Sequence, residues 1–339
     1  MTEQNPTLSL EEIRSNQYLE GQKSAYANDL KRLHKRLDEF VEVECPACGA
    51  EDATYKFEKY RCNFVECKKC KTLYMSPRPT PEIMAEYYSN SENYAFWNKY
   101  IFPKSEAKRR EKICRPNLEF IVNICNSSGM DMPTLLEVGP GFGTFASLAK
   151  ELDFFSAITV VERTPEMVDA CRKRGLNVIN ASLEELGDDQ QYAADVIVCF
   201  EVIEHIFNPL EFLKSVNLIL KPGGLFVFTC PNGQGFDTTM LQSSSPVVDT
   251  EHVNLFNTHS IGVLLERAGL DLVSVQTPGR LDVELVRNGV MDGELQIDGQ
   301  HFWHQLLVDS FDRLGSPFQH FLVENNLSGN MRVVAGKRL

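Results

Sequence analysis

Four cysteines near the start of the chain have the spacing of a metal site. The stretch CPACGAEDATYKFEKYRCNFVECKKC contains two C-x2-C pairs. The cysteines of these pairs are Cys45, Cys48, Cys67 and Cys70. Each pair can form a tight turn that directs two thiolates at one point, and four thiolates complete a tetrahedron around Zn²⁺ with no position left for water. We therefore predict a structural Zn²⁺ ion in a zinc ribbon at residues 43–78, built on a β-hairpin between the pairs.

The remaining cysteines lack this spacing. Cys62 lies between the two pairs, and we interpret it as a core residue of the ribbon. A redox dithiol is the alternative for the whole stretch, and the doubled C-x2-C disfavours it. The other five are scattered, which is typical of small buried hydrophobic residues. In a reducing compartment thiols stay free, so we predict no disulfides among the ten cysteines.

A glycine-rich turn, EVGPGFG, lies further along the chain. A run typical of a buried parallel strand precedes it and a run with helical spacing follows, which together predict a nucleotide-binding unit. A dinucleotide-binding turn has the pattern G-x-G-x-x-G, whereas here Thr144 occupies the place of the last glycine. Glu137 adds a carboxylate that would repel a pyrophosphate. An anionic dinucleotide is therefore a poor match.

The turn is similar to the E/D-x-G-x-G-x-G motif of class I S-adenosylmethionine (SAM) methyltransferases. SAM carries a sulfonium and an ammonium group, so a nearby carboxylate favours its binding. The next predicted strand, AITVVE, ends in Glu162, whose carboxylate can accept hydrogen bonds from both ribose hydroxyls. The resemblance implies that the later segment ASLEEL holds the adenine. The implied SAM contacts are Glu137, Gly139, Pro140, Gly141, Gly143, Glu162, Arg163, Ser182, Leu183, Phe200 and Glu201.

The resemblance covers residues 115–280 and the last strand. It implies an α/β fold with a doubly wound, seven-stranded, Rossmann-like methyltransferase sheet of strand order 3-2-1-4-5-7-6. An insertion at about 280–328 is too long for a hairpin and is predicted to cover the substrate. The expected parts of the chain are an N-terminal helical segment (1–42), the zinc ribbon (43–78), a helical linker (79–114) and the SAM-binding methyltransferase domain (115–339).

Two histidines follow predicted strands at the edge where open α/β sheets bind ligands. Methyl transfer is an in-line displacement at the sulfonium methyl, for which SAM supplies the reactivity and the protein supplies orientation and a dry site. A neutral hydroxyl acceptor also needs a base, and an imidazole can take the proton. We expect His205 on the cofactor side and His252 on the acceptor side. For each histidine alone, a structural role is an equal alternative.

The succession of cysteine ribbon, SAM domain and an EH-x-x-x-F segment resembles sugar-modifying methyltransferases. These include C-methyltransferases of nucleotide-linked keto sugars, in which a histidine of a comparable segment is the base. The resemblance implies this role for His252, with Glu251 as its orienting group. Those C-methyltransferases have a longer C-terminal domain. We therefore expect O-methylation of a nucleotide-linked sugar or surface-polysaccharide component, with C-methylation as the alternative.

Composition bounds the remaining classes. The 339 residues predict two units, at about one domain per 150 residues, and no apolar run approaches the roughly 20 residues that cross a bilayer. The N-terminus lacks a basic start and an apolar segment, so we predict a cytoplasmic protein without a secretory signal.

The net charge of -13 disfavours a nucleic-acid partner. An RNA methyltransferase, which can also join a zinc module to a SAM domain, and a non-catalytic protein that keeps the SAM fold stay as alternatives.

A helical pattern near the N-terminus bears on assembly. Its apolar residues step by four and three, which is typical of a seam between helices. These residues are Tyr26, Leu30, Leu33, Leu37 and Phe40. The seam predicts either packing on the chain's own domain or a homodimer.

Overall fold

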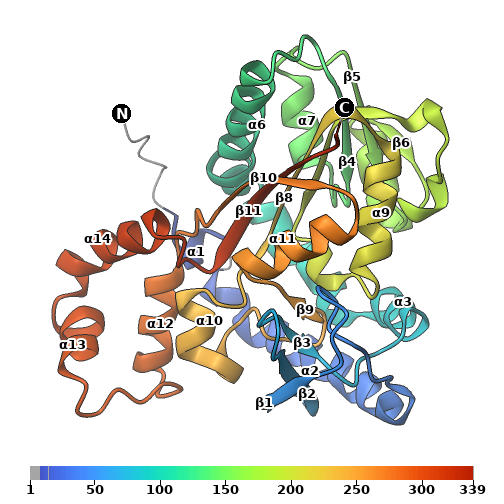
Figure 1. Cartoon of the computed structure of the whole chain (residues 1–339). Helices are drawn as coiled ribbons and strands as arrows, with labels where there is room; N and C mark the ends of the chain where they lie inside the picture. Colours follow the sequence, from blue (N-terminus) through green and yellow to red (C-terminus); the bar gives the residue numbers. More distant parts are fainter. Residues whose placement is uncertain (1–7, 14, 339) are drawn as a thin grey trace.

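The computed structural model describes residues 8–13 and 15–338, and its largest element is a seven-stranded mixed sheet (Figure 1). The order is β10-β11-β8-β7-β4-β5-β6, which numbered along the chain and read from the β6 edge is 3-2-1-4-5-7-6, as predicted. Only β11 runs antiparallel to its neighbours. The strands are β4 (Thr134–Val138), β5 (Ala157–Val161), β6 (Asn177–Ile179), β7 (Ala194–Phe200), β8 (Leu220–Pro231), β10 (Asp271–Gln276) and β11 (Asn330–Gly336).

Helices cover both faces of this sheet, which explains the continuous apolar runs of its central strands. In β4, Leu135 packs with α6 and α7, whereas Leu136 packs with α9 and α11 on the opposite face. The fold is therefore the doubly wound, Rossmann-like methyltransferase fold. The α9 helix ends at Ile219, and β8 begins at the next residue, Leu220. The covering helices are α6 (Arg115–Ser127), α7 (Thr144–Lys150), α8 (Pro165–Lys173), α9 (Pro209–Ile219) and α11 (Thr258–Arg267).

The cysteine stretch belongs to a second, four-stranded sheet of order β1-β2-β3-β9. Strands β1 and β2 form the expected antiparallel hairpin, and Tyr60 and Arg61 turn between them with φ of 53° and 61°. The fourth strand, β9, comes from the segment after β8 and pairs with β3. The ribbon is thus joined to the large domain by a shared sheet. Its strands are β1 (Ala53–Lys59), β2 (Cys62–Cys67), β3 (Leu73–Met75) and β9 (Asn254–Leu255).

The helices before and after the ribbon pack against each other. Leu33 of α2 shares a buried cluster with Ile83 and Tyr87 of α3, so part of the predicted seam lies on the chain's own helices. The homodimer stays a prediction. The buried Asp29 carboxylate accepts hydrogen bonds from the Ser91 hydroxyl and from the first N–H groups of α4. These helices are α1 (Leu10–Ile13), α2 (Leu19–Leu33), α3 (Pro81–Asn90), α4 (Glu92–Phe96) and α5 (Phe102–Arg109).

The predicted insertion between the last two strands is helical. It packs through a separate apolar cluster against α10, the helix that follows β8 (Figure 1). Its helices, with α10, are α10 (Phe236–Leu241), α12 (Asp282–Met291), α13 (His301–His304) and α14 (Phe311–Glu324). Within the described ranges, none of the helices combines the length and apolar character that a membrane span requires.

Candidate functional site

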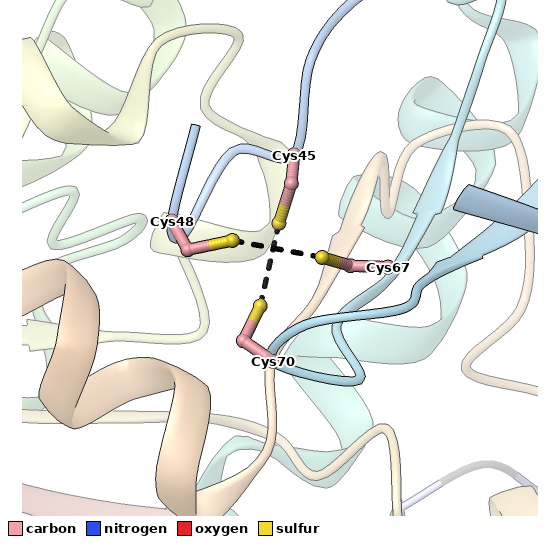
Figure 2. A group of neighbouring side chains, drawn as sticks. All are labelled: Cys45, Cys48, Cys67 and Cys70. Carbon is pink, nitrogen blue, oxygen red and sulfur yellow. Dashed lines mark hydrogen bonds between the residues drawn. The ribbon is translucent and has the colours of Figure 1, made fainter. Parts of the chain in front are cut away.

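The four predicted zinc ligands converge on one point. Figure 2 shows their side chains directed at each other from two turns. The Sγ atoms of Cys45 and Cys70 are 3.4 Å apart, those of Cys48 and Cys67 are 3.5 Å apart, and all four lie within 4.8 Å of one another. Zn–S bonds of about 2.3 Å in a tetrahedron place sulfurs slightly less than 4 Å apart. The cluster therefore fits Zn²⁺ and leaves no open coordination position.

The local conformation supports these two turns. Gly49 follows the first pair with φ of +69°, a conformation that glycine adopts without strain. Cys62 lies outside the cluster, in the apolar core between the ribbon strands and the segment before β9. Burial raises the pKa of its thiol to about 12, so it is inert at neutral pH. The interpretation of Cys62 as a core residue is consistent with this position.

The EVGPGFG turn connects β4 to α7, as predicted, and three of its glycines have positive φ. A Cβ atom on Gly139 would lie 2.7 Å from Val202, and one on Gly143 would lie 2.7 Å from Leu176. A Cβ atom on Gly141 would meet no described atom within 4 Å. Glycine is therefore required at the first and third positions by conformation and packing. At Gly141 the loop faces open space that a cofactor can fill.

Glu162 lies at the end of β5, the strand beside β4. One of its carboxylate oxygens accepts hydrogen bonds from the backbone N–H groups of Arg163 and Thr164, both at 2.8 Å. These bonds fix the carboxylate at the carboxyl end of the strand. Its second oxygen has no hydrogen bond within the described part of the chain and is the one suited to a ribose hydroxyl. Arg163 has an exposed side chain.

Glu137, the predicted carboxylate of the glycine-loop motif, is buried near the end of β4. It is 3% exposed, and its Oε2 atom has no hydrogen-bond partner among the described residues. Burial raises the pKa of Glu137 to about 8, opposed only by a hydrogen bond from the Ala146 backbone. The side chain is therefore mostly protonated at neutral pH and lies in the interior. The motif places the carboxyl group at the strand end but says nothing of its burial.

The other predicted cofactor residues differ in accessibility. Pro140 and Leu183 are buried, and the Leu183 side chain packs into the core, so only its backbone remains for an adenine contact. The half-buried Ser182 lies next to it. Phe200 packs its ring 4.7 Å from that of Phe145. Glu201 is exposed at the end of β7, has φ of 54° and accepts a hydrogen bond from Asn330 at 2.9 Å.

The two candidate histidines, expected on the cofactor side and on the acceptor side, lie side by side. Their ring centroids are 4.6 Å apart. His205 ends the short turn after β7, and its Nδ1 is 3.1 Å from the Glu251 carbonyl and 3.3 Å from the Tyr88 hydroxyl. His252 precedes β9, and its Nδ1 is 2.8 Å from the Val247 carbonyl. The pairing arises because β9 joins the ribbon sheet and brings its preceding segment across the end of β7.

Asp249, not Glu251, is the carboxylate that orients His252. Asp249 accepts hydrogen bonds from the backbone N–H groups of Glu251 and His252, and its other oxygen lies 3.4 Å from the His252 Nδ1. The Glu251 carboxylate instead accepts a hydrogen bond from the Tyr87 hydroxyl. Burial, followed by the charge of Asp249, raises the pKa of Glu251 to about 7. The signal missed in the sequence was an aspartate placed to cap the turn that precedes His252.

Tyrosines from α3 and α4 form a wall that sequence analysis did not identify. Tyr88 contacts His205, and its ring lies 5.9 Å from that of Tyr94. Partial burial, then the charges of Glu251 and Glu162, raises the pKa of the Tyr94 phenol to about 12. The segment predicted as a linker therefore packs against the histidine region. The available signal was the number of tyrosines in the segment after the ribbon.

Further contacts hold this segment on the cofactor loop. The Thr144 hydroxyl donates a hydrogen bond to Glu106 at 3.0 Å, and the Phe102 and Phe142 rings are 4.6 Å apart. The α5 helix thus closes over the EVGPGFG turn. The expected boundary between linker and domain at residue 115 does not correspond to a gap in packing.

The fold and the glycine loop define a Rossmann-like domain of the kind that binds SAM. Residues 106–275, half of the chain, match a family described as a methyltransferase domain, and the chain belongs to this family.

Curated relatives of the chain are ubiquinone biosynthesis O-methyltransferases. That of Rickettsia prowazekii (strain Madrid E) is 31% identical over 146 residues, which cover 41% of this chain and 56% of the relative. That of Idiomarina loihiensis is 27% identical over 158 residues, which cover 45% of this chain and 61% of the relative. The chain thus spans less than two thirds of the length of these relatives.

Two solved structures are similar to the chain at low identity. The 1,6-didemethyltoxoflavin-N1-methyltransferase of Burkholderia thailandensis is 12% identical, with a TM-score of 0.47, and the match covers 85% of this chain and all of that one. An S-adenosylmethionine-dependent methyltransferase from Clostridium acetobutylicum is also 12% identical, with a TM-score of 0.46 and coverage of 72% and 99%.

Proposed function

We propose that the protein is a SAM-dependent methyltransferase that transfers a methyl group to a hydroxyl of a small molecule. The observation that carries this proposal is the contact between the glycine loop and the turn that bears the first histidine. Val202, at the start of that turn, occupies the space beside Gly139, so the cofactor loop and the histidine pair adjoin. A methyl donor and a proton acceptor can then reach the same acceptor atom.

The chain's residues orient the cofactor, which supplies the electrophilic methyl group when bound. The open backbone at Gly141 can approach the cofactor closely, and the free oxygen of Glu162 can accept from the ribose hydroxyls. Tyr88 and Tyr94 line one side of the histidine region. These features support SAM and are compatible with the buried position of Glu137.

His252 is the proposed base. A carbonyl oxygen only accepts, so the His252 Nδ1 donates its hydrogen to Val247 and leaves the Nε2 lone pair for the acceptor's proton. Asp249 stabilises the imidazolium that results. Burial, and after it the neighbouring His252, lower the pKa of His205 to about 3, so His205 stays neutral and acts as a positioning residue. The Glu251 carboxylate accepts a hydrogen bond from Tyr87 and so supports the tyrosine wall.

A sugar hydroxyl is the first candidate acceptor. Hydroxyl and carboxyl groups of Tyr88, Asp249 and Glu251 surround the histidines, and such a lining can hydrogen-bond a polyhydroxylated ligand. The succession of ribbon, SAM domain and EH segment agrees with this acceptor, and C-methylation of a keto sugar stays the alternative reaction. A phenolic hydroxyl is the second candidate, because the curated relatives are named ubiquinone O-methyltransferases.

The cysteine cluster is proposed to hold a structural Zn²⁺. Its closed set of four thiolates suits that ion and no catalytic water. By stabilising the ribbon, the ion would fix β3 and therefore β9, which directly follows the His252 segment.

Incubation with methyl-labelled SAM tests the proposed function and its acceptor together. The panel contains nucleotide sugars, surface-polysaccharide fragments and catechols, with RNA as a further arm. Label in a sugar fraction supports the first candidate, and label in the catechol supports the second. Label in RNA alone would reject the small-molecule proposal.

A further inference from the structure

The histidine pair is part of a second cluster of potential metal ligands. Ligand atoms of Glu204, His205 and His252 lie within 4.8 Å of one another. The first two residues follow β7, and the third precedes β9, so the fold assembles the cluster from two distant segments. It shares no residue with the cysteine cluster.

In both imidazoles the Nδ1 atom makes the hydrogen bond that holds the ring. The His205 Nδ1 lies 3.1 Å from the Glu251 carbonyl oxygen, and the His252 Nδ1 lies 2.8 Å from the Val247 carbonyl oxygen. The hydrogen-bond network therefore assigns the proton of each ring to Nδ1 and the lone pair to Nε2. Metal-binding histidines are typically oriented in this way, with the second nitrogen donating to a backbone carbonyl or a carboxylate. Two prepared nitrogen donors thus lie side by side.

Glu204 completes the set with a buried carboxylate. The residue is 0% exposed, and neither of its carboxylate oxygens has a hydrogen-bond partner among the described residues. Burying an unpaired polar group is unfavourable, and burying an unpaired charge is far more so. A cation between this carboxylate and the two imidazoles would satisfy both oxygen and nitrogen donors. No role in SAM binding or in proton transfer explains the position of Glu204.

We propose that Glu204, His205 and His252 bind one divalent transition metal ion. Two nitrogen donors and one oxygen donor suit an ion of the borderline class, such as Zn²⁺, Mn²⁺, Fe²⁺ or Co²⁺, and disfavour Mg²⁺, which prefers oxygen ligands and retains water. Three protein ligands leave positions for further ligands. The ion can bind whether or not the protein catalyses methyl transfer.

The role of this ion rests on the proposed function. A hydroxyl oxygen that binds a divalent ion loses its proton more readily, and the proton passes to water. In the metal-bound chain the His252 Nε2 atom coordinates the ion and does not take a proton. The ion then promotes deprotonation of the acceptor hydroxyl in place of His252. In the metal-free chain the same nitrogen takes the proton directly. Glu204 separates the two mechanisms, because only the first one uses it.

Cobalt titration of the full chain tests the site. The protein is prepared with Zn²⁺ in the cysteine cluster, Co²⁺ is added, and visible absorption is followed. We expect one further Co²⁺ per chain, with ligand-field absorption but without the sulfur-to-cobalt charge transfer that exchange into the cysteines would produce. Glu204→Gln and His252→Ala should each weaken Co²⁺ binding at least about tenfold. Excess Mg²⁺ should not displace the ion.

Controls separate ligand loss from misfolding. His301→Ala removes an exposed histidine of α13 and should bind Co²⁺ like the native chain. Circular dichroism reports folding. If Glu204→Gln does not fold, His252→Ala decides the test, because His252 is only half-buried. A native chain that binds no Co²⁺ outside the cysteines, or folded variants that bind as tightly as the native chain, would overturn the proposal.

SAM calorimetry on the same samples keeps this result distinct from the proposed function. Cobalt binding without SAM binding retains the metal site and rejects the methyltransferase proposal. SAM binding without cobalt binding rejects the metal site and leaves the methyltransferase proposal standing.

Discussion

Asn254 of β9 pairs with Tyr74 of β3, so the ribbon sheet holds the segment that carries His252. A hydrogen bond of 3.0 Å from the Met75 N–H to the Val253 carbonyl lies beside this pair. Arg78, just after the ribbon, donates to the Asn254 side chain at 2.8 Å. The position of the histidine pair therefore depends on the ribbon as well as on the large sheet.

Removing a zinc ligand should affect both zinc content and activity. In Cys67→Ser we expect zinc to fall from one equivalent per chain to a small fraction and the melting temperature to fall, because metal binding contributes directly to the folding of a module this small. Turnover should fall more than SAM affinity, since β3 supports β9 and not the glycine loop. Elemental analysis, thermal unfolding and SAM calorimetry measure these effects.

The matched control for this variant is Cys114→Ser, which alters a half-buried cysteine of the helix before α6. It should retain zinc. Native protein that contains no zinc after purification from zinc-containing medium would contradict the assignment of the cysteine cluster.

Glu162→Ala should weaken SAM binding by an order of magnitude or more. The variant removes hydrogen bonds from the ribose to an ionised acceptor, each worth about 1.5–3 kcal/mol. Calorimetric titration with SAM measures the loss. Glu166→Ala, at an exposed position in the first turn of α8, is the control and should bind SAM normally. Equal affinity of Glu162→Ala and native protein would show that the ribose lies elsewhere.

The histidine variants should differ in kinetics. His252→Ala should lower kcat by about 10²–10⁴-fold, with SAM affinity nearly unchanged, because the proton acceptor is lost. His205→Ala should weaken SAM binding along with the rate, because that residue lies on the turn that contacts Gly139. His320→Ala, on the exposed side of α14, serves as the control. Near-native turnover of His252→Ala with the true acceptor would remove His252 from the mechanism.

Glu137 should make the native protein less stable as pH rises. Its pKa is about 8 in the folded chain and about 4.3 for an unperturbed glutamate, so between these values the unfolded chain loses a proton that the folded chain keeps. Unfolding is therefore favoured progressively over this window. Glu137→Gln cannot ionise and should gain on the order of 3 kcal/mol relative to native protein between pH 4 and pH 7.

Urea unfolding at these two pH values measures that gain in the free energy of unfolding. Because both proteins share the other buried carboxyl groups, the difference between them isolates Glu137. The same difference at both pH values would show that Glu137 is ionised in the folded chain.

Features encoded within one stretch of sequence were predictable. The glycines of EVGPGFG, the two C-x2-C pairs and the alternation of apolar strands with helices each depend on local conformation or spacing, and the structure has them as expected. The seven-stranded order followed from the resemblance of those elements taken together.

Features that depend on distant segments were not predictable in the same way. The addition of β9 to the ribbon sheet joins residues far apart in the chain through backbone hydrogen bonds, which side-chain patterns do not reveal. The pairing of His205 with His252 follows from that addition. The burial of Glu137 and the contact of Tyr88 with His205 likewise result from packing against elements outside their own segments.

The central claim is that the protein moves a methyl group from SAM to a small-molecule hydroxyl beside His252. The most direct test is single-turnover transfer from methyl-labelled SAM to the acceptor found in the panel, with native protein and His252→Ala compared at saturating SAM. We predict one labelled acceptor and one S-adenosylhomocysteine per native active site, and slow or absent transfer by the variant. Native protein that binds SAM stoichiometrically yet transfers label to no acceptor in the panel would contradict the claim.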